Sequence, residues 1–95
     1  MEAEFITITE YCINYHIDPA FMVSLEESEI FRFPVVEKEK CIHTDQLAEL
    51  DKYVHLHYDL QINIEGIDAI RHLLQRVHDM QEEIKELQHE LQLHK

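Results

Sequence analysis

Seven apolar residues recur in alternating steps of three and four near the C-terminus. They are Ile70, Leu73, Val77, Met80, Ile84, Leu87 and Leu91. This spacing places them on one face of a helix as a heptad seam, which His94 interrupts at the next expected position. Asn63 is suited to cap the start of that helix. We therefore predict a long coiled-coil helix over 63–95, separate from a smaller unit at 1–62.

The far part of the seam extends well past any plausible globular core. A monomer would expose it as a leucine-rich stripe, which soluble proteins avoid. We therefore predict a homodimer in which the dimerisation residues are Val77, Met80, Ile84, Leu87 and Leu91. The main rival interpretation is that a helix of a different protein docks on the stripe. The first turns of the C-terminal helix could also pack against the rest of their own subunit. Parallel and antiparallel pairings both remain open.

Two helix start signals lie close together before the seam. Thr7 and Glu10 fit a capping box, which predicts a short helix over about 8–15. Asp18 followed by Pro19 predicts a second start, with a helix over about 19–29. Two short helices joined by a tight turn are typical of a helix-turn-helix.

The chain changes character between the second helix and the seam. Residues 30–43 favour extended backbone and include Pro34, which predicts a small β-hairpin or wing with a charged tip. Thr44 is then predicted to cap a third helix over about 45–58, and 59–62 form a connector. The whole chain is expected to be mainly α-helical.

The composition excludes several classes of protein. Gly66 is the single glycine, so the chain has no phosphate-binding loop, dinucleotide motif or nucleophile elbow. No apolar run approaches a membrane span, and the first residues lack a signal peptide, so we expect a cytoplasmic protein. Cys12 and Cys41 are expected to stay as buried thiols. With no nucleophile, base and orienting group in view, we expect no catalytic residues and no enzymatic activity.

Eight histidines raise the question of a metal site. Cys12 and His16 would share one side of a helix, but no set has the regular spacing of a structural zinc site. We therefore expect no metal and no cofactor. The histidines could still shift the net charge between about pH 6 and 7.

The charge of the chain conflicts with its helix-turn-helix pattern. The net charge is −12, and residues 1–40 hold 9 acidic and 3 basic residues. A DNA-binding protein needs lysines and arginines against the phosphates. The second helix would enter the major groove in such a protein, yet it carries Glu26, Glu27 and Glu29 and no basic residue. DNA binding by this helix is therefore not expected. The three glutamates can form either a docking surface for a protein partner or simply a solvated acidic face, and the second interpretation is equally simple.

Two stretches of the chain form a recognisable pattern. They are Ile8-Thr9-Glu10-Tyr11-Cys12, and Leu60-x-Ile62-Asn63-x-x-Gly66-Ile67 with the following Leu73-Leu74. In this order they resemble the chaperone-modulator family CbpM, whose fold is that of a MerR-like winged helix-turn-helix with a long C-terminal helix. The resemblance implies a protein that binds the J-domain of a DnaJ-like (CbpA-type) co-chaperone and inhibits its cooperation with DnaK. J-domains present a basic helical face, to which an acidic protein is complementary.

The resemblance and the charge together suggest which residues would contact the J-domain. The candidate partner-binding residues are Glu26, Glu27, Glu29, Asp45, Glu49 and Asp51. One alternative is a MerR-type transcriptional regulator that contacts DNA through Arg32, Lys38 and Lys40 of the wing. The other is an acidic dimeric adaptor for a different protein.

Overall fold

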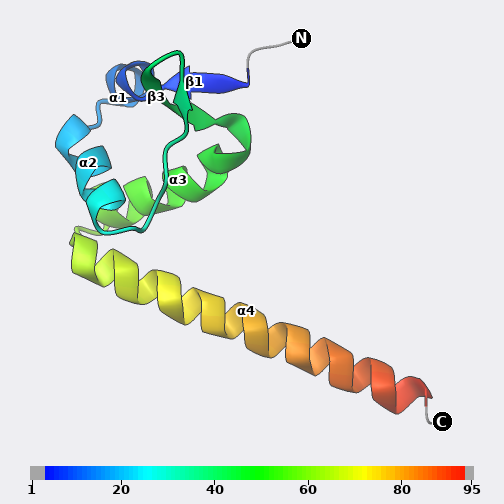
Figure 1. Cartoon of the computed structure of the whole chain (residues 1–95). Coiled ribbons are helices and arrows are strands. Elements are labelled where there is room, and N and C mark those ends of the chain that lie inside the picture. Colours follow the sequence, from blue (N-terminus) through cyan, green and yellow to red (C-terminus); the bar gives the residue numbers. More distant parts are fainter. Residues whose placement is uncertain (1–3, 94–95) are drawn as a thin grey trace.

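The computed structural model describes residues 4–93, which form a small head and one long helix that leaves it (Figure 1). The described part measures 56 × 38 × 20 Å along its principal axes. The elements are β1 (Phe5–Thr7), α1 (Ile8–Tyr15), α2 (Pro19–Glu27), β2 (Val35–Val36), β3 (Glu39–His43), η1 (Thr44–Gln46), α3 (Leu47–Val54), η2 (His55–Asp59) and α4 (Ile64–Leu93). The predicted mainly helical, winged helix-turn-helix fold is confirmed.

Both predicted start signals of the helix-turn-helix are confirmed. The Thr7 hydroxyl accepts a hydrogen bond from the backbone N–H of Glu10, and the Glu10 carboxylate accepts one from the backbone N–H of Thr7. The Asp18 carboxylate accepts from the N–H of Ala20, and Pro19 is the first residue of α2. These side chains satisfy N–H groups that have no partner within the helix.

The second helix ends two residues earlier than predicted. Glu29 has a φ of 59°, in the left-handed region, so it lies outside the helix. The backbone N–H of Ile30 then bonds to the carbonyl oxygen of Leu25, which closes the C-terminal turn. The chain has no glycine here to take this conformation, and Glu29 adopts it instead.

The predicted wing is present as a hairpin, and the N-terminal strand joins it. β3 lies in the middle of a three-stranded antiparallel sheet, with β1 and β2 on either side. Glu37 and Lys38 form the turn between β2 and β3, with φ angles of 52° and 69°. In β1, Ile6 pairs with Ile42 of β3, and Ile42 is fully buried.

The start of the third helical segment differs from the prediction. The N-cap is His43 rather than Thr44, because the ring Nδ1 of His43 accepts from the N–H of Asp45 and the Gln46 side chain accepts from the N–H of His43. Thr44 lies inside the short 3₁₀ turn η1. The helix predicted over 45–58 is also divided. The α-helix α3 ends at Val54, and the π-helical segment η2 follows it directly.

The core of the head lies between the helix-turn-helix, the sheet and α3. Its fully or nearly fully buried side chains are Tyr11, Met22, Leu25, Ile42, Leu50 and Ile67. Ile67 is the one residue of α4 that is buried, so the long helix is anchored to the head by its first turns.

The start of α4 follows the predicted signal. The Asn63 side-chain oxygen accepts a hydrogen bond from the N–H of Gly66 at 2.8 Å. A Cβ atom at position 66 would lie 2.6 Å from the Cγ2 of Ile62, so a side chain there would force the entry to α4 to shift. The division into units at 1–62 and 63–95 stays a prediction.

Candidate functional site

The solvent-facing side of α2 is apolar at its start and acidic at its end. Phe21, Met22 and Leu25 point into the core, which leaves the opposite side of the helix exposed. The exposed residues on that side are Pro19, Ala20, Val23 and Glu27. Ser24, the one hydroxyl residue of the helix, is half-buried. The exposed side chains therefore offer no hydrogen-bond donor to a base edge or a phosphate.

The structure brings two of the predicted acidic residues to one hollow beside the wing. Glu26 and Glu29 line it together with Ile30, Phe31 and Arg32, around a volume of about 350 Å³. The Glu26 carboxylate forms an ion pair with the ammonium group of Lys40 in β3. One of the wing cations is thus already neutralised by the helix-turn-helix.

The other predicted acidic residues lie elsewhere. The Asp51 carboxylate accepts a 2.6 Å hydrogen bond from the Tyr11 hydroxyl of α1. Glu49 accepts a 2.8 Å hydrogen bond from the Tyr53 hydroxyl on its own helix. Asp45 is exposed in η1, within 3.5 Å of the His43 ring. The six carboxylates are therefore spread over several places rather than gathered in one site, because α3 presents Glu49 and Asp51 in different directions.

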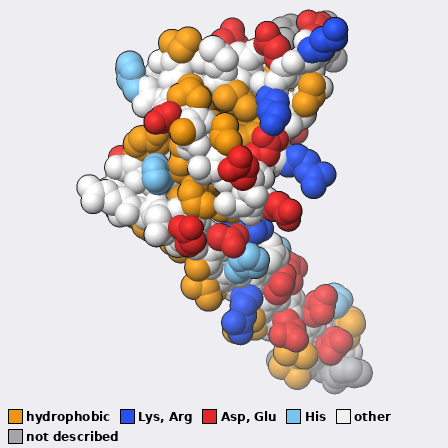
Figure 2. Space-filling model, turned by 60° about the vertical axis from the view of Figure 1, so that its left-hand side comes forward, with side chains coloured by type: hydrophobic (Ala, Val, Ile, Leu, Met, Phe, Trp, Pro, Cys, Tyr) orange, Lys and Arg blue, Asp and Glu red, His pale blue; other side chains and the backbone are white. Residues whose placement is uncertain are grey.

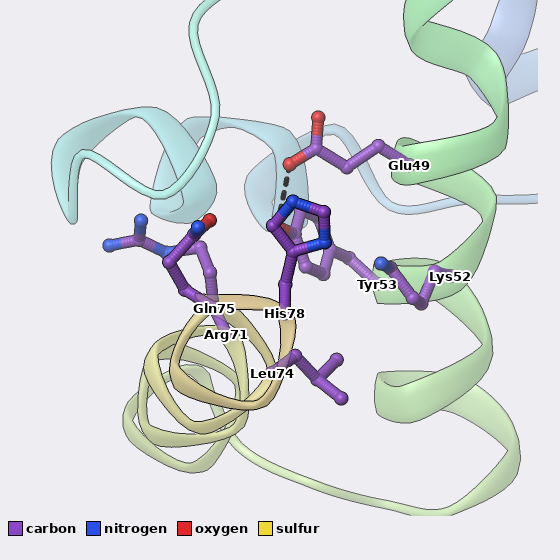
Figure 3. Close-up of a pocket in the computed structure, with 7 residues that line it drawn as sticks. All are labelled: Glu49, Lys52, Tyr53, Arg71, Leu74, Gln75 and His78. Carbon is purple, nitrogen blue, oxygen red and sulfur yellow. Dashed lines mark hydrogen bonds between the residues drawn. The ribbon is translucent and has the colours of Figure 1, made fainter. Parts of the chain in front are cut away.

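A polar cleft lies where α3 meets α4 (Figure 3). It has a volume of about 220 Å³ and is lined by Glu49, Lys52 and Tyr53 of α3 and by Arg71, Leu74, Gln75 and His78 of α4. No sequence pattern pointed to this cleft, because it forms only where the side chains of two separate helices come together.

Two side chains of the cleft are held by contacts within the protein. Burial, and then the hydrogen bond to Glu49, raise the pKa of Tyr53 well above its ordinary value of 10.0, so this hydroxyl keeps its proton near neutral pH. Arg71 forms an ion pair with Asp68 at 2.8 Å, while its buried Nε has no hydrogen-bond partner.

Comparison with known families identifies the fold. A family model described as "MerR HTH family regulatory protein" matches residues 6–89. The chain belongs to this family. No curated protein and no solved structure gave a significant match to it. The match covers the helix-turn-helix, the wing and most of α4, and so agrees with the whole described architecture.

The C-terminal helix of this MerR-family protein carries the predicted seam on its surface. About half or more of each seam residue beyond the head is exposed in the single chain, with exposed fractions of 48% for Val77, 54% for Met80, 53% for Ile84, 61% for Leu87 and 63% for Leu91. Exposure begins even earlier than expected, since Leu73 is 57% exposed. The seam therefore leaves the head without an intramolecular cover.

The described residues contain no cluster of three or more histidine, cysteine or acidic side chains with the geometry to hold a metal ion. Within 4–93, no helix combines the length and apolarity that crossing a membrane requires. Cys12 and Cys41 are both buried as free thiols, as predicted. Burial raises the pKa of the Cys12 thiol, which disfavours the reactive thiolate.

Proposed function

We propose that this MerR-family protein binds the J-domain of a DnaJ-like co-chaperone and inhibits its cooperation with DnaK. The CbpM modulators belong to the same family, and the first turns of α1 and the entry to α4 resemble theirs. The observation that carries the proposal is the exposed face of α2. It combines apolar side chains with the Glu27 carboxylate at the place where a DNA-binding relative presents donors.

The physical argument is one of charge and chemistry. Specific DNA contacts are hydrogen bonds from Arg, Lys, Asn or Gln to base edges, supported by cations on the phosphates. The exposed face of α2 offers none of these residue types. A basic protein helix is complementary to the same face, because carboxylates speed its encounter and orient it.

The test is a calorimetric titration, at low and at high salt, of the whole protein with the J-domain of a co-chaperone from the same organism. We expect saturable binding that weakens with salt, and inhibition of J-domain-stimulated ATP hydrolysis by DnaK. Glu27→Lys, an exposed position, should weaken binding several-fold. Absence of binding at low salt would contradict the proposal.

The ion pair between Glu26 and Lys40 provides a matched control. Glu26→Lys reverses one charge of the face and also breaks the pair. The double variant Glu26→Lys/Lys40→Glu keeps both the pair and the net charge. If broad electrostatic attraction dominates, the double variant should bind nearly as well as the wild type, while Glu26→Lys should bind more weakly.

A DNA-binding regulator is the second candidate, because the winged architecture of the family is retained and the wing segment exposes two cations, Arg32 before β2 and Lys38 in the turn between β2 and β3. Such a protein would depend on the wing cations. Tight, sequence-selective and salt-sensitive binding of a duplex, lost in Lys38→Ala, would favour this function over J-domain binding.

We also propose that two copies associate through the seam of α4. The exposed fractions of its apolar side chains support this, since burying them against a second helix removes them from water.

A further inference from the structure

An apolar groove lies between α1 and the start of α2. It has a volume of about 180 Å³, and the residues that line it are Ile8, Thr9, Cys12, Ile13, Ile17 and Pro19. Ile13 stands at its edge with 68% of its surface exposed. Val23 is 51% exposed and lies one helical turn beyond Pro19 on the same side of α2. We call this groove, together with the exposed Val23 next to it, the helix-turn-helix groove.

The segment that forms the groove is acidic, and of its carboxylates Glu26 alone is paired with a cation of the described chain, Lys40 of β3. Residues 8–31 contain no lysine or arginine. The acidic residues of this segment are Glu10, Asp18, Glu26, Glu27 and Glu29. Glu10 lies three residues before Ile13 on α1, and Glu27 lies four residues after Val23 on α2, so both carboxylates share a side of the helix with the apolar contact. Figure 2 brings this side of the head forward and shows hydrophobic side chains gathered across it, with acidic side chains among and around them and lysine or arginine side chains toward the right.

We propose that the helix-turn-helix groove receives the apolar ridge of an amphipathic helix whose flanks carry lysine or arginine. This inference deepens the proposed function and rests on it, since it names the surface that the J-domain helix would contact. The apolar centre supplies most of the affinity by leaving water, and the carboxylates around it set the orientation of the incoming helix.

The charge around the groove selects this occupant over others. Glu26 is paired with Lys40, and the other four carboxylates leave this surface with a net negative charge, which repels both a nucleic acid and an anionic lipid surface. A second copy of the same face would bring like charges together. A helix that is apolar along one side and basic along its flanks matches both properties of the surface.

The decisive experiment uses substitutions for which an apolar contact and electrostatic attraction have opposite effects. Val23→Glu and Ile13→Glu add negative charge to exposed positions, so attraction alone would strengthen binding of a basic J-domain. If the groove is the contact, each should instead weaken binding about tenfold or more in calorimetry. Val35→Glu is the matched control, because Val35 is 63% exposed on the wing, and its binding should stay within about twofold. Unchanged or tighter binding by Val23→Glu and Ile13→Glu would overturn the inference.

A second measurement separates failure of this inference from failure of the J-domain proposal. The probe is an 18-residue synthetic amphipathic helix made of leucine, alanine and lysine, titrated into methyl-labelled full-length protein. Shifts of the Ile13 and Val23 methyl groups, with no response from Val35, support the groove even if the J-domain does not bind. Shifts confined to α4, or none at all, would overturn the inference. Variant melting temperatures within about two degrees of the wild type exclude misfolding as the cause.

Discussion

The hydroxyl of Tyr11 donates a 2.6 Å hydrogen bond to the carboxylate of Asp51, 40 residues further along the chain. The bond joins α1 of the helix-turn-helix to α3, and the Tyr11 ring is almost completely buried. Asp51 was a candidate partner-binding residue from sequence. The structure gives it a structural role within the head.

Removing this hydrogen bond should lower stability. Tyr11→Phe keeps the ring in the core and leaves the exposed Asp51 carboxylate free to be solvated, so we expect a loss of about 1 kcal/mol in the free energy of unfolding. Urea denaturation measures it. Tyr15→Phe is the control, because Tyr15 is 61% exposed, and it should change stability by less than about 0.5 kcal/mol. Equal effects of the two variants would contradict the structural role.

Stability should fall at alkaline pH. Burial, and then a hydrogen bond to a carboxylate, raise the pKa of Tyr11 and of Tyr53 above their ordinary value of 10.0. A folded-state pKa above the unfolded value gives stability that is fully present below about pH 10 and is lost as the pH rises beyond it. Urea titrations between about pH 8 and 11 test this, and Tyr11→Phe should flatten the dependence. An identical pH profile for the variant and the wild type would refute the assignment to Tyr11.

The turn of the wing should be improved by glycine. Lys38 has a φ of 69°, a conformation that costs an L-residue about 1 kcal/mol and costs glycine almost nothing. Lys38→Gly should therefore raise the free energy of unfolding by up to about 1 kcal/mol. Lys52→Gly, the same substitution inside α3, should lower it by about 1 kcal/mol. Thermal melts of both variants suffice, and effects of the same sign would be inconsistent with the turn geometry.

The proposed self-association should depend on one face of α4. Ile84→Glu puts a charge in the seam, where the side chain is 53% exposed in the single chain. We expect it to shift the protein toward the monomer in sedimentation equilibrium at micromolar concentration. His89→Glu adds a glutamate on the opposite face of the helix and should leave the association state unchanged. A wild-type protein that sediments as a monomer would contradict the proposal.

The local start signals were the most predictable part of the fold. The Thr7–Glu10 box, the Asp18–Pro19 start and the Asn63 cap depend on hydrogen bonds within a few residues, so their sequence pattern is enough to specify them. The start of the third helical segment was harder to predict from the sequence. His43 replaces Thr44 as its cap because the sheet fixes the backbone there, with the N–H of Thr44 bonded to the carbonyl oxygen of Glu4.

The sequence by itself determined the helical content, the acidic character and the apolar seam of α4, because these follow from residue type and periodicity. Only the tertiary structure decided which carboxylates have contacts within the protein. It joined Asp51 to Tyr11, paired Glu26 with Lys40, and left Glu27 exposed. Those contacts connect segments far apart in the chain, and so no local pattern could specify them. The groove beside Ile13 is formed by neighbouring residues of the chain, but it depends on how α1 packs against α2, which the local start signals do not specify.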